Sequence, residues 1–278
     1  MKSRPSFPAK LPPAGGQPAM ALNPPAVQGN SRPVAAGHEP SIGRVSPAPG
    51  RPSPLSSMPV SSGLGLDSGA VRACMVAKLV EQGVQDTWVL QAMGQVERHR
   101  FVETALAGQA YEDTSLPIGL GQTISKPNVV ARMIELLRQD APGKLGRVLE
   151  IGTGCGYQSA VLSHLASEVY SIERLRGLHE KAKKNLLPFR LPNVHLMLGD
   201  GMLGFPKGAP YAGIISAAGG DEVPSVWLEQ LAVGARLVAP TVTASGHQAL
   251  VVIRRTATSF DRQVLEAVHF VPLKSGIA

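Results

Sequence analysis

The feature that most constrains the fold is a short apolar run that leads directly into three closely spaced glycines. Residues 148–151 read Val-Leu-Glu-Ile, and glycines follow at positions 152, 154 and 156. Such a run is typical of a buried parallel strand, and glycine allows a sharp turn and close approach to a ligand because it has no Cβ. Residues 158–165 continue with helical spacing. Strand, turn and helix together predict the opening of a βαβ unit that binds a nucleotide-like ligand.

The spacing of the glycines indicates which nucleotide-like ligand is bound. A dinucleotide fingerprint would require glycines at 152, 154 and 157. Position 157 is Tyr, and the third glycine is Gly156. The pattern therefore favours S-adenosylmethionine, which has no pyrophosphate to bind at the helix N-terminus. Taken alone, the same residues also fit a simple tight turn.

Two carboxylates end the next two predicted strands. Glu173 ends the run 169–173, about 20 residues beyond the first glycine, which is the offset expected for an acid that binds ribose hydroxyls. Asp200 ends the run 194–200. Either acid alone could equally be a solvated loop residue. Two acids at successive strand ends, after this glycine turn, indicate a shared ligand site.

Residues 1–66 differ in composition from the rest of the chain. They hold 14 of the 24 prolines, and their few large apolar side chains show no period. We therefore expect a disordered tail over 1–66 and a folded domain over 67–278. Six basic residues and one acid give the tail a net charge of +5, out of +7 for the whole chain. The domain is thus nearly neutral and carries no recognisable nucleic-acid module, so we expect no nucleic-acid partner.

The cysteines and the apolar runs indicate the cellular setting. Cys74 and Cys155 lie far apart and match no metal spacing, so we expect no metal and a reducing, cytoplasmic location. No apolar run approaches the roughly 20 residues that would span a membrane, so we expect no membrane association. We expect the chain to act as a monomer.

Periodicity over the domain predicts an α/β fold. Helices are expected from Val71 to Leu79, after Asp86 as a capping residue, and from Pro127 to Leu137. His99 lies between the second and third of these helices and is interpreted as a surface or packing residue. Further strands are expected at 211–216, 235–239, 248–254 and 264–271, with one helix at 224–231. Strands that first alternate with helices and then pair directly indicate a doubly wound, mostly parallel sheet with an antiparallel C-terminal hairpin and an extra N-terminal helical segment.

Residues 116–127 form an unusual loop, which two glycines and two prolines constrain. Pro127 suits the first turn of a helix. Thr123 and Ser125 therefore stand just before a helix N-terminus, where backbone N–H groups are free to bind an anion. The alternative is that Ser125 only caps the helix.

From about Val71 to Leu273 the chain resembles the protein-L-isoaspartate O-methyltransferases. The glycine turn is shared by many methyltransferases, whereas the Thr-Ile-Ser sequence at 123–125 points to this family. Four segments carry the resemblance: residues 109–127, 148–157, 169–174 and Gly-Asp-Gly at 199–201.

The resemblance implies a class I S-adenosylmethionine-dependent methyltransferase fold and a repair activity. The methyl group goes to the free carboxylate of L-isoaspartyl residues in damaged proteins and peptides, and S-adenosyl-L-homocysteine is the second product. The ester then closes to a succinimide, which hydrolyses partly to normal aspartate. Ser125 matches the active-site serine. The implied cofactor contacts are Gln122, Thr123, Ile124, Ser125, Glu150, Gly152, Gly154, Gly156, Glu173, Asp200, Gly201 and Gln248. The implied substrate contacts are Thr123, Ser125, Ser216, Ala217 and Ala218.

The chemistry of the residues agrees with a carboxylate acceptor. A carboxyl group has a reference pKa of about 4, so it is already ionised at pH 7 and needs no general base. No His or Cys dyad lies near the glycine turn. Holding the anion in line with the methyl group and excluding water is enough, which is a proximity effect.

Three departures from the family pattern bear on the substrate. Lys126 stands where Gln or Ala is common, and Cys155 where Ser is common. Residues 216–221 read Ser-Ala-Ala-Gly-Gly-Asp, where the family more often has a Thr-Ala-Ala-Ala-Pro-like run. This stretch would border the substrate, so the preferred peptide is less defined than the reaction.

Two other functions remain open at this point. A methyltransferase acting on an amine or phenol would usually need an acid or base near the acceptor, and none is evident. A non-catalytic binding protein that works through its Pro-rich tail would be expected to lack Glu173, Asp200 or the glycines, and all are present.

The composition of the tail leads to the first prediction. A truncated chain that starts at Asp67 should keep the thermal midpoint of unfolding and the methyl-transfer rate of the full chain, because the tail has too little apolar surface to pack on the domain. Calorimetry and a transfer assay on both chains test this. A large loss of either quantity would show that the tail supports the domain.

Overall fold

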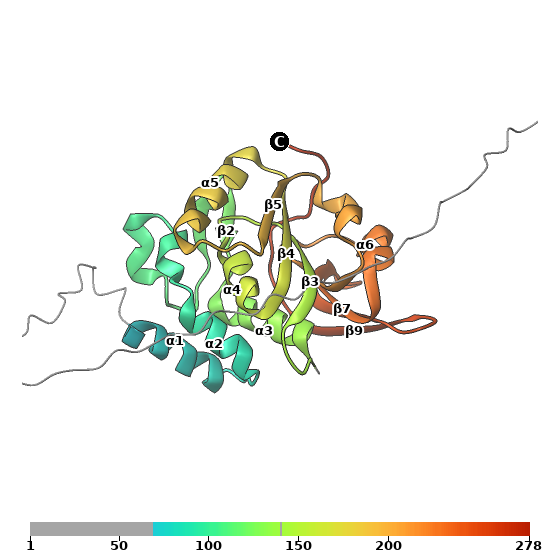
Figure 1. Cartoon of the computed structure of the whole chain (residues 1–278), viewed down its shortest axis with the longest axis horizontal. Helices are drawn as coiled ribbons and strands as arrows, with labels where there is room; N and C mark the ends of the chain where they lie inside the picture. Colours follow the sequence, from blue (N-terminus) through green and yellow to red (C-terminus); the bar gives the residue numbers. More distant parts are fainter. Residues whose placement is uncertain (1–68, 140) are drawn as a thin grey trace, which may run out of the picture. The chain divides into compact units, whose positions relative to one another are not determined.

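A seven-stranded sheet forms the framework of the protein (Figure 1). The structure is a computed structural model that describes residues 69–139 and 141–278. The predicted tail lies outside these residues. The strand order is β5-β4-β3-β6-β7-β8-β9. The strands are β3 (Leu145–Ile151), β4 (Ala166–Glu173), β5 (Val194–Leu198), β6 (Tyr211–Ser216), β7 (Leu231–Val242), β8 (Gln248–Arg255) and β9 (Phe260–Ala267).

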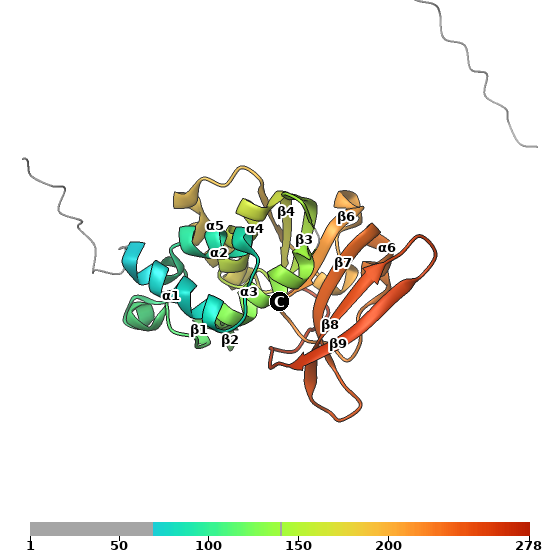
Figure 2. The same ribbon diagram turned by 90° about the horizontal axis from the view of Figure 1, so that it is seen from below.

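The direction of the strands confirms the predicted fold class. From β5 to β7 every neighbouring pair is parallel, and β8 and β9 complete the sheet as antiparallel strands. In Figure 2, β7, β8 and β9 lie side by side at the end of the sheet farthest from α5. The chain runs outward through β4 and β5 and then returns to place β6 on the other side of β3. This reversal creates a switch point beside β3, and ligands of open α/β sheets bind at the carboxyl ends of the strands at such a point.

Helices cover both faces of the sheet because successive strand residues point to opposite sides. Val148, Ile215 and Val238 belong to a core that also holds apolar side chains of five helices. Leu149 and Ile214 face the other way and pack with Trp227 of the sixth helix. The five helices are α1 (Gly69–Glu81), α2 (Thr87–Gln95), α3 (Pro127–Arg138), α4 (Tyr157–Leu165) and α5 (Arg176–Leu186), and the sixth is α6 (Ser225–Gln230). Short 3-10 helices connect them: η1 (Arg98–Phe101), η2 (Thr104–Gln109), η3 (Leu187–Phe189), η4 (Gly201–Leu203) and η5 (Pro206–Gly208).

Local signals account for the first two helices. Gly83, at φ 97°, follows the end of α1. The Asp86 carboxylate accepts hydrogen bonds from the N–H groups of Trp88 and Val89 at 2.8 and 3.2 Å, so it caps α2 as predicted. Within the described ranges, no helix is both long and apolar enough to cross a bilayer.

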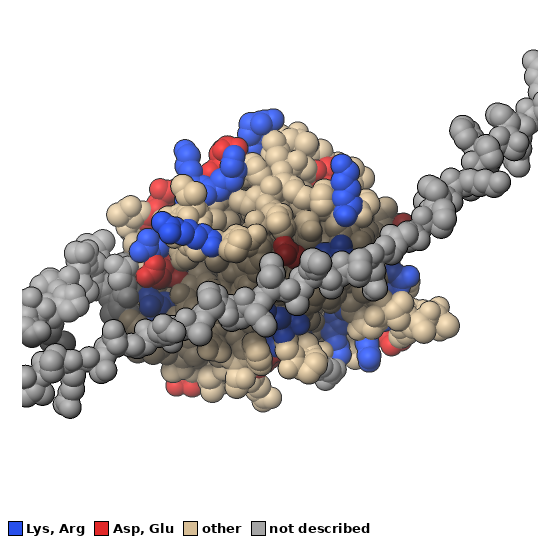
Figure 3. Space-filling model, in the orientation of Figure 1, with Lys and Arg blue, Asp and Glu red and all other residues tan. Residues whose placement is uncertain are grey.

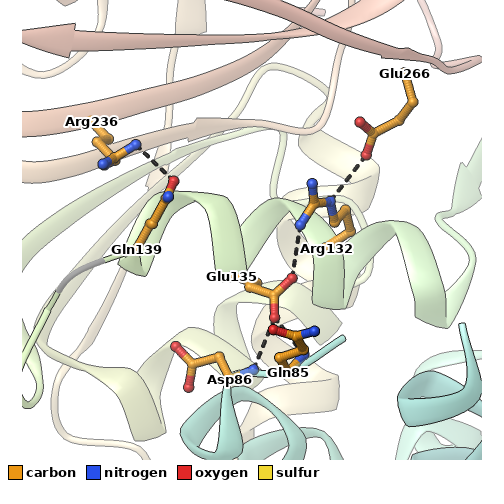
Figure 4. A network of polar contacts seen from close by, with 7 residues as sticks. All are labelled: Gln85, Asp86, Arg132, Glu135, Gln139, Arg236 and Glu266. Carbon is orange, nitrogen blue, oxygen red and sulfur yellow. Dashed lines mark hydrogen bonds and ion pairs between the residues drawn. The ribbon is translucent and has the colours of Figure 1, made fainter. Parts of the chain in front are cut away.

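Polar contacts attach α3 to segments on both sides of it (Figure 4). Glu135 accepts hydrogen bonds from the backbone N–H groups of Gln85 and Asp86, at 2.6 and 2.9 Å. Arg132 donates to Glu135 at 2.9 Å and to Glu266 of β9 at 3.2 Å. Exposed ion pairs each contribute little to stability, but this network links the N-terminal helices, α3 and the C-terminal hairpin. The helix α3, which begins two residues after Ser125, is therefore attached to a rigid scaffold.

Charged side chains of both signs are spread over the surface. In Figure 3, Lys and Arg side chains are distributed over the visible face, with Asp and Glu among them. The basic groups on this face are therefore interspersed with acidic ones and do not form one continuous patch.

The structure corrects the predicted loop at 116–127. Its first part is an antiparallel hairpin of β1 (Leu116–Gly119) and β2 (Gln122–Ile124), in which Leu116 pairs with Ile124. Leu116, Ile118 and Ile124 are buried, so burial of alternate apolar residues stabilises strands that are too short for a periodic signal.

Two further elements differ from the prediction. The helix α5 follows β4, although the sequence analysis did not anticipate it. The last strand, β9, was expected at 264–271, but it begins and ends four residues earlier. The reason is a tight turn after β8, in which the N–H and hydroxyl of Thr256 both donate to the Ser259 carbonyl.

Candidate active site

A cavity of about 390 Å³ lies at the carboxyl ends of β3 and β4. Its volume falls within the range of ligand pockets, roughly 300–1,000 Å³. Its walls come from segments far apart in the chain: residues 120–125, the glycine turn, the end of β4, Gly201, Ala217 and Ala218, and residues 271–274. The cavity therefore coincides with the switch point of the sheet.

The glycine turn forms one wall of this cavity. Gly152 and Gly154 line it and have φ values of 89° and 57°, a region that L side chains rarely adopt. A Cβ on Gly154 would also lie 3.2 Å from Cδ1 of Ile118, across the turn in the hairpin. Gly156 has φ 92° and begins α4 as its capping residue, but it does not line the cavity. The turn thus exposes bare backbone to a ligand.

Glu173 is held at the end of β4 with its carboxylate in the cavity wall. Its two oxygens accept hydrogen bonds from the backbone N–H groups of Gly154 and Leu175, both at 2.9 Å. A carboxylate oxygen can accept more than one hydrogen bond, so each oxygen retains capacity for a ligand hydroxyl. This rigid acceptor beside a bare glycine backbone fits the ribose of S-adenosylmethionine.

Glu150 is fully buried behind the turn and does not line the cavity. One of its oxygens accepts hydrogen bonds from the hydroxyls of Ser159 and, at 2.6 Å, Ser171. The other has no hydrogen-bond partner among the described residues. Burial raises the pKa of Glu150 to about 7, against the partial compensation of the serine hydroxyls. In the structure Glu150 thus supports the strand end from behind the cavity wall, and its cofactor contact stays a prediction.

The hairpin brings four of the predicted residues to the cavity together: Gln122, Thr123, Ile124 and Ser125. Ser125 is half-buried, and its hydroxyl makes no hydrogen bond to the described residues. Lys126, not Ser125, occupies the capping position of α3. The capping role considered for Ser125 is therefore not observed, and its hydroxyl is free to bind a ligand.

The N-terminus of α3 offers fewer free N–H groups than expected. The N–H of Asn128 donates to the Asp113 carboxylate at 2.9 Å. Pro127 has no N–H to offer. The start of α3 therefore has fewer free N–H groups for an anion than the sequence suggested, because a carboxylate from a preceding loop accepts the Asn128 N–H.

Three other predicted residues lie beside the cavity without lining it. Asp200 accepts hydrogen bonds from the N–H groups of Met202 and Gly276, at 2.9 and 2.7 Å. Gln248 binds the backbone of Phe270 through both ends of its amide. The Ser216 hydroxyl donates to the Ala218 carbonyl at 2.8 Å. These side chains, and Glu150, hold the segments that line the cavity, whereas the other predicted positions except Gly156 line it themselves.

Residues 271–274 were missed by the sequence analysis. They line the cavity together with the hairpin and the glycine turn. The chain then continues to the C-terminus, where Arg174 donates to the Gly276 carbonyl at 2.9 Å and Ala278 donates to the Arg174 carbonyl at 2.9 Å. Figure 1 accordingly shows the C-terminus near α5. No local signal could reveal this, because the partners lie about a hundred positions apart.

The ionisable groups near the cavity do not form a nucleophile and base pair. Burial raises the pKa of the Cys155 thiol to about 11, so it carries its proton at neutral pH. His99 lies outside the cavity and bonds the Tyr111 hydroxyl through Nδ1 at 2.7 Å, as a packing residue. Among residues 69–139 and 141–278, no cluster of His, Cys, Asp and Glu could hold a metal ion.

Comparison with known proteins decides the family. The family model described as protein-L-isoaspartate(D-aspartate) O-methyltransferase matches residues 71–278. The chain belongs to this family. It is therefore an S-adenosylmethionine-dependent methyltransferase that repairs isoaspartyl residues in proteins, as the resemblance implied.

Individual relatives agree with this assignment. The protein-L-isoaspartate O-methyltransferase of Methylibium petroleiphilum is 60% identical over 218 residues, which cover 77% of this chain and 81% of the relative. That of Burkholderia ambifaria is 52% identical over 274 residues, which cover 96% of this chain and 88% of the relative. The second alignment includes most of residues 1–66, so a comparable N-terminal extension occurs in at least one family member.

Solved structures show the same fold. A protein-L-isoaspartate O-methyltransferase superposes with a TM-score of 0.67 at 29% identity, covering 74% of this chain and 67% of that chain. A putative one from Plasmodium falciparum, in complex with S-adenosyl-L-homocysteine, gives a TM-score of 0.62 at 23% identity, covering 73% and 98%.

The geometry of Glu173 leads to a prediction for cofactor binding. Glu173→Ala should weaken the affinity for S-adenosylmethionine by roughly tenfold or more, because a hydrogen bond to a charged group contributes about 1.5–3 kcal/mol. Isothermal titration calorimetry measures this. Glu168→Ala is the matched control, since Glu168 is an acid on the same strand outside the cavity. Unchanged affinity in a folded Glu173→Ala protein would remove Glu173 from the site.

The burial of Glu150 leads to a prediction for stability. Its pKa is about 7 in the folded protein and near its ordinary value of 4.5 in the unfolded chain. Between pH 4.5 and about pH 7 the Glu150 carboxyl group is mostly ionised in the unfolded chain but mostly protonated in the folded protein. The contribution of Glu150 to the free energy of unfolding therefore falls as pH rises. Glu150→Gln should therefore gain stability relative to the wild type between pH 5 and pH 8. Urea unfolding at both pH values tests this, and a pH-independent difference would contradict it.

Proposed function

We propose that Ser125 binds the free carboxylate of an isoaspartyl residue inside the cavity, beside the methyl donor. The observation that supports this is that the hairpin segment carrying Ser125 and the glycine turn line one cavity. Bound S-adenosylmethionine supplies an electrophilic methyl group. The task of the chain is to bring an acceptor oxygen to that group and to hold it there.

The proposed role of Ser125 is to orient the acceptor. Its hydroxyl donates a hydrogen bond to one oxygen of the substrate carboxylate, which leaves the other oxygen directed toward the methyl group. No proton has to be removed, because the carboxylate is ionised at neutral pH. Thr123, Ala217 and Ala218 complete the wall around the acceptor, and Ala217 and Ala218 leave space for the peptide. The catalytic contribution is one of proximity and orientation.

The proposed cofactor site combines direct contacts with residues that support them. Glu173 accepts hydrogen bonds from the ribose hydroxyls, and Gly152 and Gly154 allow the backbone to approach the ligand. Gly201 also lines the cavity, and a Cβ at this position would lie 2.6 Å from Cγ2 of Ile151. Residues 122–125 close the cavity over the bound ligand. Asp200, Glu150, Gly156 and Gln248 act from behind these contacts.

We also propose that the protein acts as a monomer in the cytoplasm. Support comes from the two cysteines: Cys74 is exposed and Cys155 buried, and both are free thiols, as expected in a reducing compartment. Sedimentation velocity and subcellular fractionation are the direct tests.

The role proposed for Ser125 leads to a prediction for the turnover number. Ser125→Ala should lower the turnover number by roughly ten- to a few hundredfold, the scale expected for losing one hydrogen bond to a charged group. Thermal stability and S-adenosylmethionine affinity should remain near the wild-type values, because the hydroxyl has no bond to the described residues. Steady-state kinetics with matched isoaspartyl and aspartyl peptides measure the effect.

Two control variants distinguish hydrogen bonding by Ser125 from a nonspecific effect of losing a hydroxyl and from nucleophilic attack. Ser115→Ala removes an exposed hydroxyl just before the hairpin, outside the cavity, and should leave turnover unchanged. Ser125→Cys should not restore activity, because the proposed role is hydrogen bonding and not nucleophilic attack. Full turnover in Ser125→Ala would refute the assignment.

A further inference from the structure

Arg98, in η1, is fully buried and bonds three backbone carbonyls. Its Nε donates to Ala110 at 2.8 Å, and its Nη2 donates to Ser125 at 2.7 Å and to Thr114 at 3.5 Å. These carbonyls lie at the two ends of the segment that contains the hairpin. One side chain therefore ties both ends of this segment to the same point.

The same guanidinium also contacts the other wall of the cavity. Its central carbon lies 4.7 Å from the centre of the Tyr157 ring, in cation–π geometry. Tyr157 directly follows the glycine turn and lines the cavity, as Ser125 does. Arg98 itself does not line the cavity. Arg98 thus lies directly behind the wall, between the segment that carries Ser125 and the start of α4 at Tyr157.

The placement of Arg98 is energetically costly. Burying a cation is unfavourable, and no carboxylate among the described residues lies within ion-pair distance of Arg98, although the Asp113 carboxylate attracts it from farther away. Desolvation lowers its pKa, and its Nη1 has no hydrogen-bond partner within the described chain. An apolar side chain would fill this space without that cost. The planar set of donors is therefore the property that distinguishes Arg98 from a simple packing residue.

The hairpin needs an anchor of this kind. A two-stranded hairpin alone is only marginally stable in water, and β1 and β2 form a sheet of two strands. The proximity mechanism requires the acceptor to be held accurately, since a misplacement of about 1 Å can cost on the order of a hundredfold in rate.

We infer that Arg98 is a positioning residue for methyl transfer, which fixes the segment carrying Ser125 against the glycine turn through its carbonyl bonds and its contact with Tyr157. This inference rests on the role proposed for Ser125. It assigns Arg98 no contact with substrate or cofactor.

Arg98→Lys, which keeps the charge but loses the planar donors, tests the inference. Arg138→Lys is the matched control. Arg138 is also buried, donates to the Gly143 carbonyl at 2.9 Å and lies 5.5 Å from the Trp88 ring, but it pairs with Asp86 and is remote from the cavity. Both substitutions should lower the thermal midpoint. Only Arg98→Lys should lower the turnover number per folded molecule, by about ten- to a hundredfold, with a smaller change in KM for an isoaspartyl peptide.

A double mutant separates this inference from the proposed function. Residues that act through one another are not additive, so Arg98→Lys should have little further effect on turnover in a Ser125→Ala background. Additive losses would overturn the inference and leave Ser125 in place. No loss in Ser125→Ala alone would instead refute the proposed function. Turnover in Arg98→Lys equal to that in Arg138→Lys would also overturn the inference.

If Arg98→Lys does not fold, hydrogen exchange of the wild-type protein tests whether the hairpin is anchored to the domain. If Arg98 anchors the hairpin, the amides of β2 exchange only with the slow, cooperative opening of the domain. Rapid local exchange of β2 while β3 stays protected would show that the hairpin is not anchored, and it would overturn the inference.

Discussion

The hydrogen bond from the Gly154 N–H to the Glu173 carboxylate joins the carboxyl ends of the two central parallel strands. A buried carboxylate needs such donors, and the left-handed backbone of the glycine turn is what directs this N–H toward it. The strand ends, the turn and the start of α4 therefore form one rigid unit. The remaining walls of the cavity are built around that unit.

Segments from both ends of the folded chain converge on this unit. The hairpin before the sheet supplies one wall of the cavity, and the segment after β9 supplies another. Asp200 and Arg174 attach the C-terminal segment through its backbone near Gly276. Because main-chain groups make most of these attachments, the shape of the cavity depends less on which side chains the C-terminal segment carries. An enzyme that relies on proximity benefits from walls held in this way.

Three buried ionisable side chains illustrate different ways of tolerating a charge. Arg138 pairs with a carboxylate, whereas Arg98 is surrounded by carbonyls and an aromatic ring. Glu150 is bonded by serine hydroxyls, and burial raises its pKa so that a neutral form is accessible near pH 7. Arg98 and Glu150 lie directly behind the cavity walls. Such networks are costly to form but leave few alternative arrangements, which suits a site that must remain rigid.

Local signals in the sequence were sufficient to predict the architecture and the residues around the glycine turn. Apolar periodicity and the glycine turn are local signals, and they correctly predicted the doubly wound sheet and the helix that begins at Pro127, whereas the Thr-Ile-Ser sequence at 123–125 indicated the family. The glycine turn and Glu173 could also be predicted from the sequence, because strand ends at a switch point lie together, and the family resemblance implied the 122–125 segment. The short hairpin was missed because strands of three or four residues carry too little periodicity, and α5 was not predicted either.

Which polar side chains face the cavity could be read only from the folded structure. The sequence assigned Asp200, Gln248, Ser216 and Glu150 to the site, yet the side chain of each binds a partner beside or behind the wall. Asp113 takes the N–H at the start of α3 that the sequence assigned to an anion. The physical reason is that a hydrogen bond depends on the position of both partners. Those partners come from segments whose separation in the chain carries no information about their distance in the fold.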